Sequence, residues 1–293
     1  MKKLMFAVVA AASMVTFAAE EKESSFLDNF WGFGNYGIYS GYQLYGSLVN
    51  SEPTAQGYIE GNFNIGDLGY VGLGLWSNTD TTERRKDNMS GLFNEWDFNV
   101  HFGRTFWLNN DQTVGIAWRS SVVWYYYPPA NYKGGRHGGG YHYRENRGSY
   151  TTMDFNHYFE LVNPIVVPYI NVVREYKKGA NLLQFGLKKT LAITDGISIT
   201  PYIEGVWREA QYSWCFPTGF GSCDNCNSGV ATAKIGLDCN WQLSEHFGLF
   251  AKVAYCSIVD HDLRMNIEDE LDKSAYGATK DFAWGGIGVT FNF

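Results

Sequence analysis

The chain has 293 residues, of which 17% are aromatic and 33 are glycine, yet its mean hydropathy is only −0.25. A chain that is rich in large rings but not apolar on average suits a sheet with one apolar face and one hydrated face. The net charge of −7 argues against a protein that grips nucleic acid or anionic lipid with its whole surface. Composition does not shift along the chain, so one domain is expected.

The first residues are typical of a secretory signal peptide. Two lysines precede an uncharged apolar run over 4–19, with small residues before a cleavage point after Ala18. The run is shorter than the roughly 20 residues that a membrane-spanning helix needs. We therefore predict a signal peptide at 1–18 and a short periplasmic segment at 19–35, in a protein exported to a compartment that permits disulfides.

From residue 36 onward, apolar residues recur at every second position, which is the period of a β-strand. In "NEWDFNVHFG", for example, Trp96, Phe98 and Val100 alternate with Asp97 and Asn99. Each such strand has one apolar and one polar face. The predicted strand segments are 36–46, 56–65, 69–78, 93–106, 112–127, 150–161, 165–176, 181–191, 197–212, 229–242, 246–258 and 279–293.

The connections between these segments alternate in length. Short turns are predicted at 66–68, 107–111, 162–164, 192–196 and around Ser244, and long loops at 47–55, 79–92, 128–149, 213–228 and 259–278. The connection at 177–180 is the one exception: it is short, although the alternation would place a long loop there. Short periplasmic turns that alternate with long outer loops are typical of a transmembrane barrel.

Two all-β architectures fit alternating strands with Gly-rich turns. Strands of a soluble β-sandwich usually have about 5 to 6 residues and would not carry charges at mid-strand. The longer segments found here suit strands that cross a bilayer. We therefore predict a transmembrane antiparallel up-and-down β-barrel of about 12 strands over 36–293, with 10 or 14 strands as alternatives and both termini periplasmic.

The last segment shows why such a sheet must close. Backbone groups in lipid have to be paired within the protein, so the last strand should pair with the first. Phe291 and Phe293 would face lipid, while Thr290 and Asn292 would face the lumen. The terminal aromatic residue resembles the signal read by the outer-membrane assembly machinery of Gram-negative bacteria, which makes that machinery an expected partner.

Two prolines interrupt predicted strands. Pro168 and Pro201 each lack the N–H that a ladder hydrogen bond needs. Both lie close to a predicted short turn, so we expect β-bulges there.

Residues 36–129 resemble the start of the TorF-type family of porins. The family pattern has an aromatic-rich first strand, a P-x-x-Q-G entry to the second, a G-x-W-x-S-N hairpin and a Y-Y-P exit. The matching stretches are "YGIYSGYQLYG" (36–46), "PTAQGYIE" (53–60), "YVGLGLWSNTD" (70–80), "EWDFNVHFG" (95–103) and "VGIAWRSSVVWYYYPP" (114–129). The chain departs from the pattern at Tyr45, where the family usually has Arg before its Gly. The resemblance implies an outer-membrane porin.

Charged residues at mid-strand positions of the polar faces are nearly balanced in sign. Opposed charges can focus a field across a water-filled constriction and orient a polar solute. Alternatively, mutually paired side chains could fill the interior, as in small barrels. The predicted lumen residues are Glu60, Glu95, Asp97, His101, Arg119, Asp154, Glu160, Lys188, Glu204, Arg208, Lys234, Asp238 and Lys252.

The predicted long loop at 128–149 is rich in glycine and basic residues. Such a loop could fold inward and present cations to an anionic solute, or it could be a solvated outer loop. Its candidate constriction residues are Lys133, Arg136, His137, His142, Arg144 and Arg147.

The cysteines allow a disulfide in the outer loops. Cys239 falls on the lipid face and should stay unpaired. The other four, which allow three connectivities, all belong to the outer end and are candidates for at least one disulfide: Cys215, Cys223, Cys226 and Cys256. "CDNC" could instead be a redox pair or half a zinc site, but no second metal pair accompanies it.

The function predicted from these features is an outer-membrane channel of a Gram-negative-type bacterium, through which small polar solutes diffuse passively. We expect no cofactor, no metal, no nucleic acid and no enzymatic activity. One alternative is a closed barrel with a structural or adhesive role. Another is an outer-membrane hydrolase, in which Asp260, His261 and Asp262 would act with Glu95 or Asp97 as an acid-base set.

Overall fold

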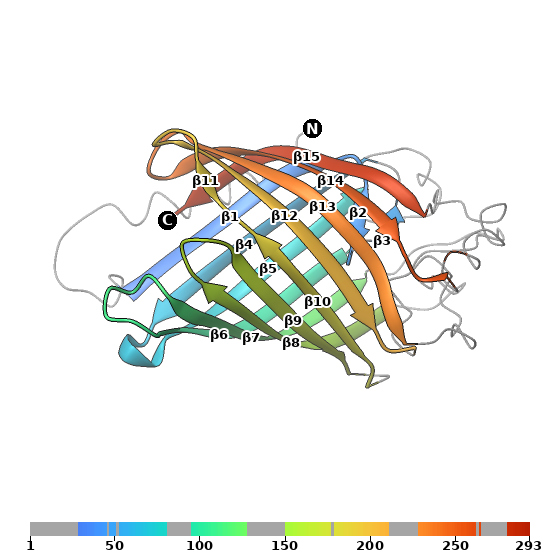
Figure 1. Ribbon diagram of the computed structural model, residues 1–293, viewed down its shortest axis with the longest axis horizontal. Coiled ribbons are helices and arrows are strands. Elements are labelled where there is room, and N and C mark those ends of the chain that lie inside the picture. Colours follow the sequence, from blue (N-terminus) through green and yellow to red (C-terminus); the bar gives the residue numbers. More distant parts are fainter. Residues whose placement is uncertain are drawn as a thin grey trace.

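The computed structural model describes residues 29–45, 47–50, 53–80, 95–127, 150–176, 179–210, 228–261, 264 and 280–293. Within these residues the chain forms an all-β fold, a closed antiparallel barrel of twelve strands (Figure 1). The predicted fold class and strand number are confirmed. The predicted signal peptide lies outside the described residues.

The strands follow chain order around the wall, and the last one, β15, pairs with the first, β1, to close it. Two short pieces, β10 and β11, both pair with β12 and make up one interrupted strand. The barrel strands are β1 (Phe30–Tyr39), β4 (Thr54–Asn64), β5 (Tyr70–Asp80), β6 (Glu95–Trp107), β7 (Gly115–Tyr127), β8 (Tyr150–Val162), β9 (Val167–Glu175), β10 (Asn181–Lys188), β11 (Leu191–Ala192), β12 (Ile197–Arg208), β13 (Gly229–Gln242), β14 (Phe247–Ile258) and β15 (Asp281–Asn292).

The first strand differs from its predicted bounds. The predicted segment 36–46 combines two elements, because β1 begins at Phe30 and ends at Tyr39, and a separate hairpin follows. The hairpin consists of β2 (Tyr42–Leu44) and β3 (Ser47–Asn50), which pair only with each other. The alternation of large residues continues across Ser40 and Gly41, so the pattern alone does not reveal where the strand leaves the wall.

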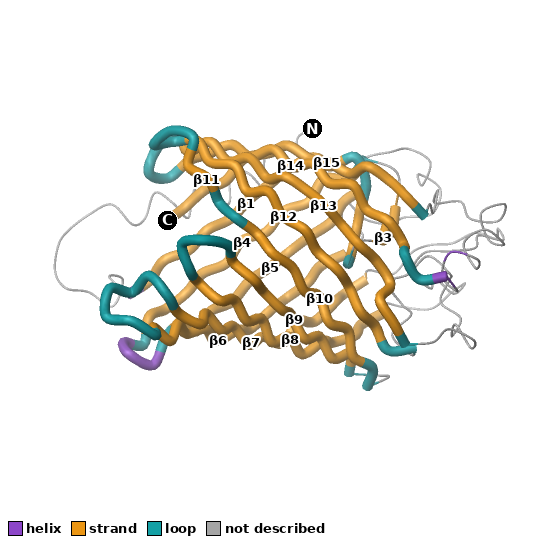
Figure 2. Tube along the Cα trace, in the orientation of Figure 1, coloured by secondary structure: helices purple, strands orange, loops and turns teal. Residues whose placement is uncertain are grey.

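Short turns gather at one end of the barrel, which we call the turn end (teal at the left in Figure 2). Side chains satisfy the free backbone groups of these turns. Asn163 Oδ1 accepts N–H bonds from Ile165 and Val166 at 3.0 and 3.1 Å. The hydroxyl oxygens of Thr194 and Ser244 each accept the N–H of the residue three positions on. The opposite end, which carries β2 and β3, is called the loop end.

The outer face of the barrel is apolar. Leu73, Ile235 and Ile287 are each more than half exposed, although they lie within strands. Exposed aromatic residues mark the turn end of this face: Phe30, Phe106, Trp241 and Phe247. An apolar band with an aromatic girdle at the interface is the pattern of barrels that span a bilayer. No helical turn in the described residues is long and apolar enough to cross a membrane.

The seam between β1 and β15 is paired to its last residue. Gly32 donates its N–H to the Phe293 carbonyl oxygen at 2.8 Å, and Phe293 donates back at 3.0 Å. The rings of Phe291 and Phe293 lie over Gly34 and Gly32, where any side chain would collide with them. Small residues in the first strand therefore allow the last strand to dock closely.

The bulges predicted at Pro168 and Pro201 are absent. Both prolines stay in register with a neighbouring strand, and the register shift in this part of the wall lies between Val206 and Trp207 instead. Beside Pro201 it is the neighbouring strand that is interrupted, between β10 and β11, and the N–H of Lys189 in that gap still reaches the Pro201 carbonyl oxygen at 3.2 Å. The N–H that Pro201 lacks is therefore tolerated because the neighbouring strand is interrupted beside it.

Ile235→Arg should cost about 2–4 kcal/mol of folding free energy in lipid vesicles, because its side chain sits near the middle of β13, where the hydrocarbon is thickest. Leu68→Arg is the control. Leu68 is as exposed, at 63% against 59%, but it lies in the turn-end helix η3 (Gly66–Leu68) and should cost close to nothing. Urea titration in vesicles measures both, and equal costs would mean that the outer face is not in lipid.

Candidate functional site: the barrel lumen

The polar face of the wall turns inward and forms a network of charged side chains. Four ion pairs between described residues of the strands lie along it. They are Arg119–Glu60 at 2.8 Å, Lys188–Glu160 at 2.5 Å, Lys234–Glu204 at 2.6 Å and Lys252–Asp238 at 3.4 Å. Four of the five predicted lumen bases thus meet an acid that was also predicted for the lumen.

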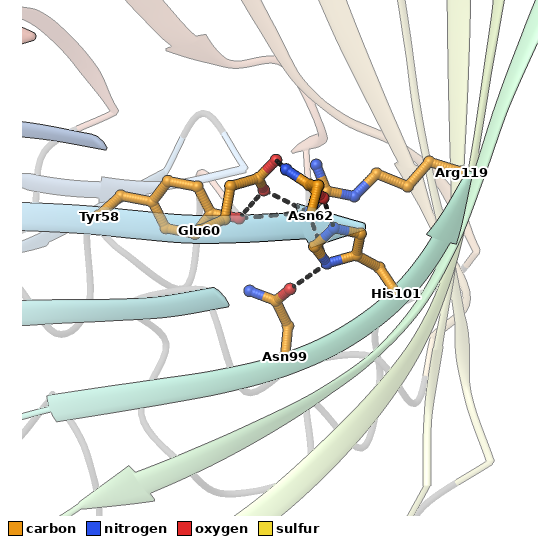
Figure 3. Close-up of polar contacts among 6 residues, drawn as sticks. All are labelled: Tyr58, Glu60, Asn62, Asn99, His101 and Arg119. Atoms are coloured by element: carbon orange, nitrogen blue, oxygen red, sulfur yellow. Dashed lines mark hydrogen bonds and ion pairs between the residues drawn. The ribbon is translucent and has the colours of Figure 1, made fainter. Parts of the chain in front are cut away.

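The Arg119 cluster is drawn in Figure 3. Glu60, on β4, is 2% exposed and accepts hydrogen bonds from the Tyr58 hydroxyl and from Asn62 Nδ2 at 3.0 Å. Arg119, on β7, donates through Nη2 to Glu60 Oε2 at 2.8 Å and to the Tyr58 hydroxyl oxygen at 3.2 Å. A carboxylate this buried requires both a cation and neutral donors, and the cluster provides them.

His101, on β6, joins the cluster through both ring nitrogens. The Asn62 amide group donates to Glu60, so its Oδ1 is left as an acceptor, 2.7 Å from His101 Nε2. Nδ1 lies 3.1 Å from Arg119 Nη2 and 2.8 Å from the side-chain oxygen of Asn99 (Figure 3). The imidazole is a structural bridge between β4 and β7.

Glycines on the intervening strand make this bridge possible. Gly72, on β5, lies in register between Asn62 and His101. A Cβ atom at position 72 would overlap both Asn62 Oδ1 and the His101 ring. Side chains from β4 and β6 can therefore meet across β5 only because β5 presents glycine there.

A second cluster lies on the adjoining part of the wall, from β8 to β13. Tyr158 donates to Glu160 at 2.7 Å, beside the Lys188 pair. On β12, Glu204 accepts bonds from the Tyr169 hydroxyl at 2.8 Å and from Gln184 Nε2 at 2.7 Å, in addition to Lys234. As at Glu60, phenol and amide donors hold Glu204 against the wall, whereas Glu160 has the phenol alone.

The remaining predicted base, Arg208, has a partner that the sequence did not indicate. It is fully buried at the end of β12, and its Nη2 lies 3.8 Å from Asp260 Oδ2. Asp260 is also a member of the hydrolytic set that is the alternative reading of the sequence. Asp260 and His261 follow β14, which is five strands away from β6 around the wall. The topology therefore keeps them apart from Glu95 and Asp97, which lie on β6. Asp262 lies outside the described residues.

The predicted acids Glu95, Asp97 and Asp154 gather near the loop end, together with Glu175, which was not predicted. Glu95, Asp154 and Glu175 are at most 3% exposed. Tyr125 donates to Asp154 at 3.1 Å, and Thr152 donates to Glu175 at 2.9 Å. Among the described residues, no group of His, Cys, Asp and Glu side chains could hold a metal ion.

The hairpin β2–β3 folds into the lumen at the loop end, a feature that the sequence analysis missed. Trp284 Nε1, on β15, donates to the Gly41 carbonyl oxygen at 2.8 Å at the base of the hairpin, and Thr232, on β13, donates to that of Tyr45 at 2.8 Å near its tip. Tyr45 has a φ of 50°, which suits a tight hairpin turn. Leu44 and Tyr45 pack against a buried cluster contributed by five strands and the approach to β10: Val173, Ala180, Leu182, Val206, Ala231 and Ile258.

Below the hairpin lies a cavity of about 590 Å³. Tyr45 contributes to its lining from the hairpin, and Arg119, Tyr158 and Glu160 contribute from the wall. The lining also includes Arg104 and several neutral polar residues: Asn99, Ser121, Asn156 and Asn171. The cavity thus joins the two charged clusters beneath the hairpin.

One cysteine prediction requires correction. Cys256, a predicted disulfide partner, is a free thiol that is fully buried in an apolar cluster with Tyr39, Leu48, Phe250, Ala254, Phe282 and Trp284. It faces the lumen beneath the hairpin, so a loop cysteine would have to enter the packed cluster to reach it. Cys239 is also free. The other candidates, Cys215, Cys223 and Cys226, and the whole basic loop from Lys133 to Arg147 lie outside the described residues.

Comparisons with known proteins identify the fold and nothing finer. No family model matches the chain, and no curated protein matches it. Among solved structures, an outer membrane channel from Pseudomonas putida F1 superposes with a TM-score of 0.50 at 11% identity and covers 94% of this chain and 100% of its own. The NanC porin gives a TM-score of 0.47 at 11% identity, with 88% and 98% covered. The chain has the fold of outer-membrane β-barrels.

Gly72→Ala should destabilise the barrel by about 1–3 kcal/mol, because the new methyl group separates Asn62 from His101 in a packed cluster. Gly229→Ala is the matched control, since a Cβ atom there would meet only Asp260, at 3.7 Å. Urea unfolding followed by tryptophan fluorescence measures both. A Gly72→Ala protein as stable as the control would show that the bridge across β5 is not a packed contact.

Glu204→Gln should cost about 3 kcal/mol, because Lys234 would be left in the wall without its carboxylate at only 10% exposure. Asp281→Asn removes an acid from the much more exposed pair with Arg264 and should cost less than about 1 kcal/mol. The same unfolding assay compares them. Similar losses in the two variants would contradict the assignment of Glu204 to a shielded lumen pair.

Proposed function

We propose that the protein is an outer-membrane channel for passive diffusion of small polar solutes. The observation that carries the proposal is the combination of an apolar outer face with a hollow, charged interior. Of the paired bases, Arg119, Lys188 and Lys252 have side chains 29–36% exposed, so the inner wall is in contact with water rather than packed solid. Arrays of opposed charge around a water-filled passage orient polar solutes and exclude apolar ones.

The β2–β3 hairpin sets the width of the passage in this proposal. It leaves the wall between β1 and β4, is held by bonds from β15 and β13, and contributes Tyr45 to the cavity lined by Arg119. A solute that enters at the loop end must therefore pass beside Tyr42 or Tyr45. The resemblance of residues 36–129 to TorF-type porins agrees with a channel role, and a Gram-negative outer membrane would be its location.

A closed barrel with a structural role is the second candidate, and one observation favours it. The hairpin seals one side of the loop end with two apolar clusters, in which Leu48, Val173, Leu182 and Ile258 are buried. If no gap remains beside the hairpin, the lumen is a pocket rather than a pore. The two candidates differ only in whether ions cross.

Conductance in planar bilayers distinguishes them. The channel proposal expects stepwise ion currents from the purified protein, and larger steps when the hairpin is removed. Because Tyr39 and Thr54 pair directly on β1 and β4, an Asn-Gly turn can replace residues 40–53 without reaching across a gap. Tyr45→Gly is a milder variant that removes the ring and suits the positive φ; its steps should also be larger.

Circular dichroism and resistance to unfolding in detergent show that each variant is folded. A folded native protein that carries no current at any voltage would refute the channel. Current that appears only after the hairpin is replaced would instead assign the native chain to the closed class, with the hairpin as its plug.

A further inference from the structure

The four lumen ion pairs share an asymmetry that bears on which solutes the lumen accepts. In every pair the base is more exposed to the lumen than its acid. The side-chain exposures of base and acid are 29% and 1% for Arg119–Glu60, 33% and 20% for Lys188–Glu160, 10% and 6% for Lys234–Glu204, and 36% and 26% for Lys252–Asp238. Although the pairs are neutral in sum, the surface that a solute meets is cationic.

Neutral donors hold two of the four acids against the wall. Tyr58 and Asn62 donate to Glu60, and Tyr169 and Gln184 donate to Glu204. Each donor draws its carboxylate toward the wall and occupies lone pairs that a cationic solute would otherwise use. Among the described residues, Lys234 and Lys252 have no hydrogen-bond partner besides their acid, and each ammonium group lies over an aromatic ring.

Arg119 retains the most unused hydrogen-bonding capacity. All of its hydrogen bonds to described residues are made through Nη2, to Glu60, Tyr58 and His101. Its Nε and Nη1 groups have no partner within the described part of the chain, and the side chain lines the 590 Å³ cavity. Guanidinium N–H groups in a sheltered site are strong donors to carboxylate and other oxyanion groups.

The rest of the cavity suits the same ligand. Glu160, the one carboxylate among the described lining residues, is already neutralised by Lys188 at 2.5 Å and accepts from the Tyr158 hydroxyl at 2.7 Å. Arg104 is a second cationic lining residue, and neutral ones such as Asn99 and Asn156 can donate to hydroxyl groups. A cavity of this size is in the range of small-molecule sites.

We propose that this cavity is a binding site for small hydroxylated organic anions, whose carboxylate or similar oxyanion group contacts Arg119. The inference rests on the proposed function and narrows it to an anion-preferring passage. The anion is held by Nε–H and Nη1–H of Arg119, and its hydroxyl groups face the amides of the wall. The bound anion would leave the cavity at the loop end, beside the hairpin, where water replaces its contacts with the protein.

Gluconate and sorbitol test the proposal, because they have the same carbon chain and differ in the carboxylate. Calorimetric titration of the detergent-solubilised protein should detect gluconate and not sorbitol. In the bilayer, gluconate should reduce the chloride current, and the reversal potential in a salt gradient should indicate anion preference.

The Arg119 variant is a double one, Glu60→Gln with Arg119→Gln, so that no buried carboxylate is left without its cation. Gluconate affinity should fall about tenfold or more, as expected when a charge-assisted hydrogen bond is lost. Arg174→Gln is the control: it removes the same charge from an exposed position near the loop end and should bind as the native protein does.

The outcomes separate this inference from the channel proposal. Gluconate binding that depends on Arg119 in a barrel that carries no current would support the site and refute only the channel. A barrel that conducts but binds gluconate and sorbitol alike, or binds gluconate equally well in the double variant, would overturn the site. Cation preference of the current with no gluconate binding would overturn it as well.

Discussion

The structure depends on one constraint: the backbone hydrogen bonds of a sheet in hydrocarbon must all be made within the sheet. Twelve strands satisfy it by closing β15 onto β1, down to the reciprocal bonds between Gly32 and Phe293. In a closed sheet, alternate side chains along a strand can face only the outside of the barrel or the enclosed volume. Apolar side chains face the bilayer and polar ones face the enclosed volume, so the chemistry of the lumen is a direct consequence of the closure.

A polar interior creates its own problem, because carboxylates away from bulk water need partners. The chain solves it twice in the same way, at Glu60 and at Glu204, with a base on one side and phenol and amide donors on the other. Glycines on intervening strands, such as Gly72, allow these groups to meet across a strand. Pairing therefore need not fill the lumen: it anchors the acids to the wall and leaves the bases facing the water.

Much of the fold could be predicted from the sequence, because the strand period, the alternation of turn lengths and the inward position of the mid-strand charges are local properties. What could not be predicted depends on contacts between distant residues. The β2–β3 hairpin has the same alternation as the strand before it, and only its packing against Val206 and Ile258 shows that it leaves the wall. Likewise, the burial of Cys256 and the pairing of Arg208 with Asp260 follow from which strands become neighbours, which no single segment reveals.

The central claim is that lipid covers one face of every strand and water the other. Spin labels placed one at a time at positions 233–238 of β13, in a cysteine-free background and in lipid vesicles, test it most directly. Collision with oxygen should be high and collision with a water-soluble nickel chelate low at 233, 235 and 237, with the reverse at 234, 236 and 238. Equal access of the nickel chelate to both sets, or protection of the first set from both reagents, would contradict the account.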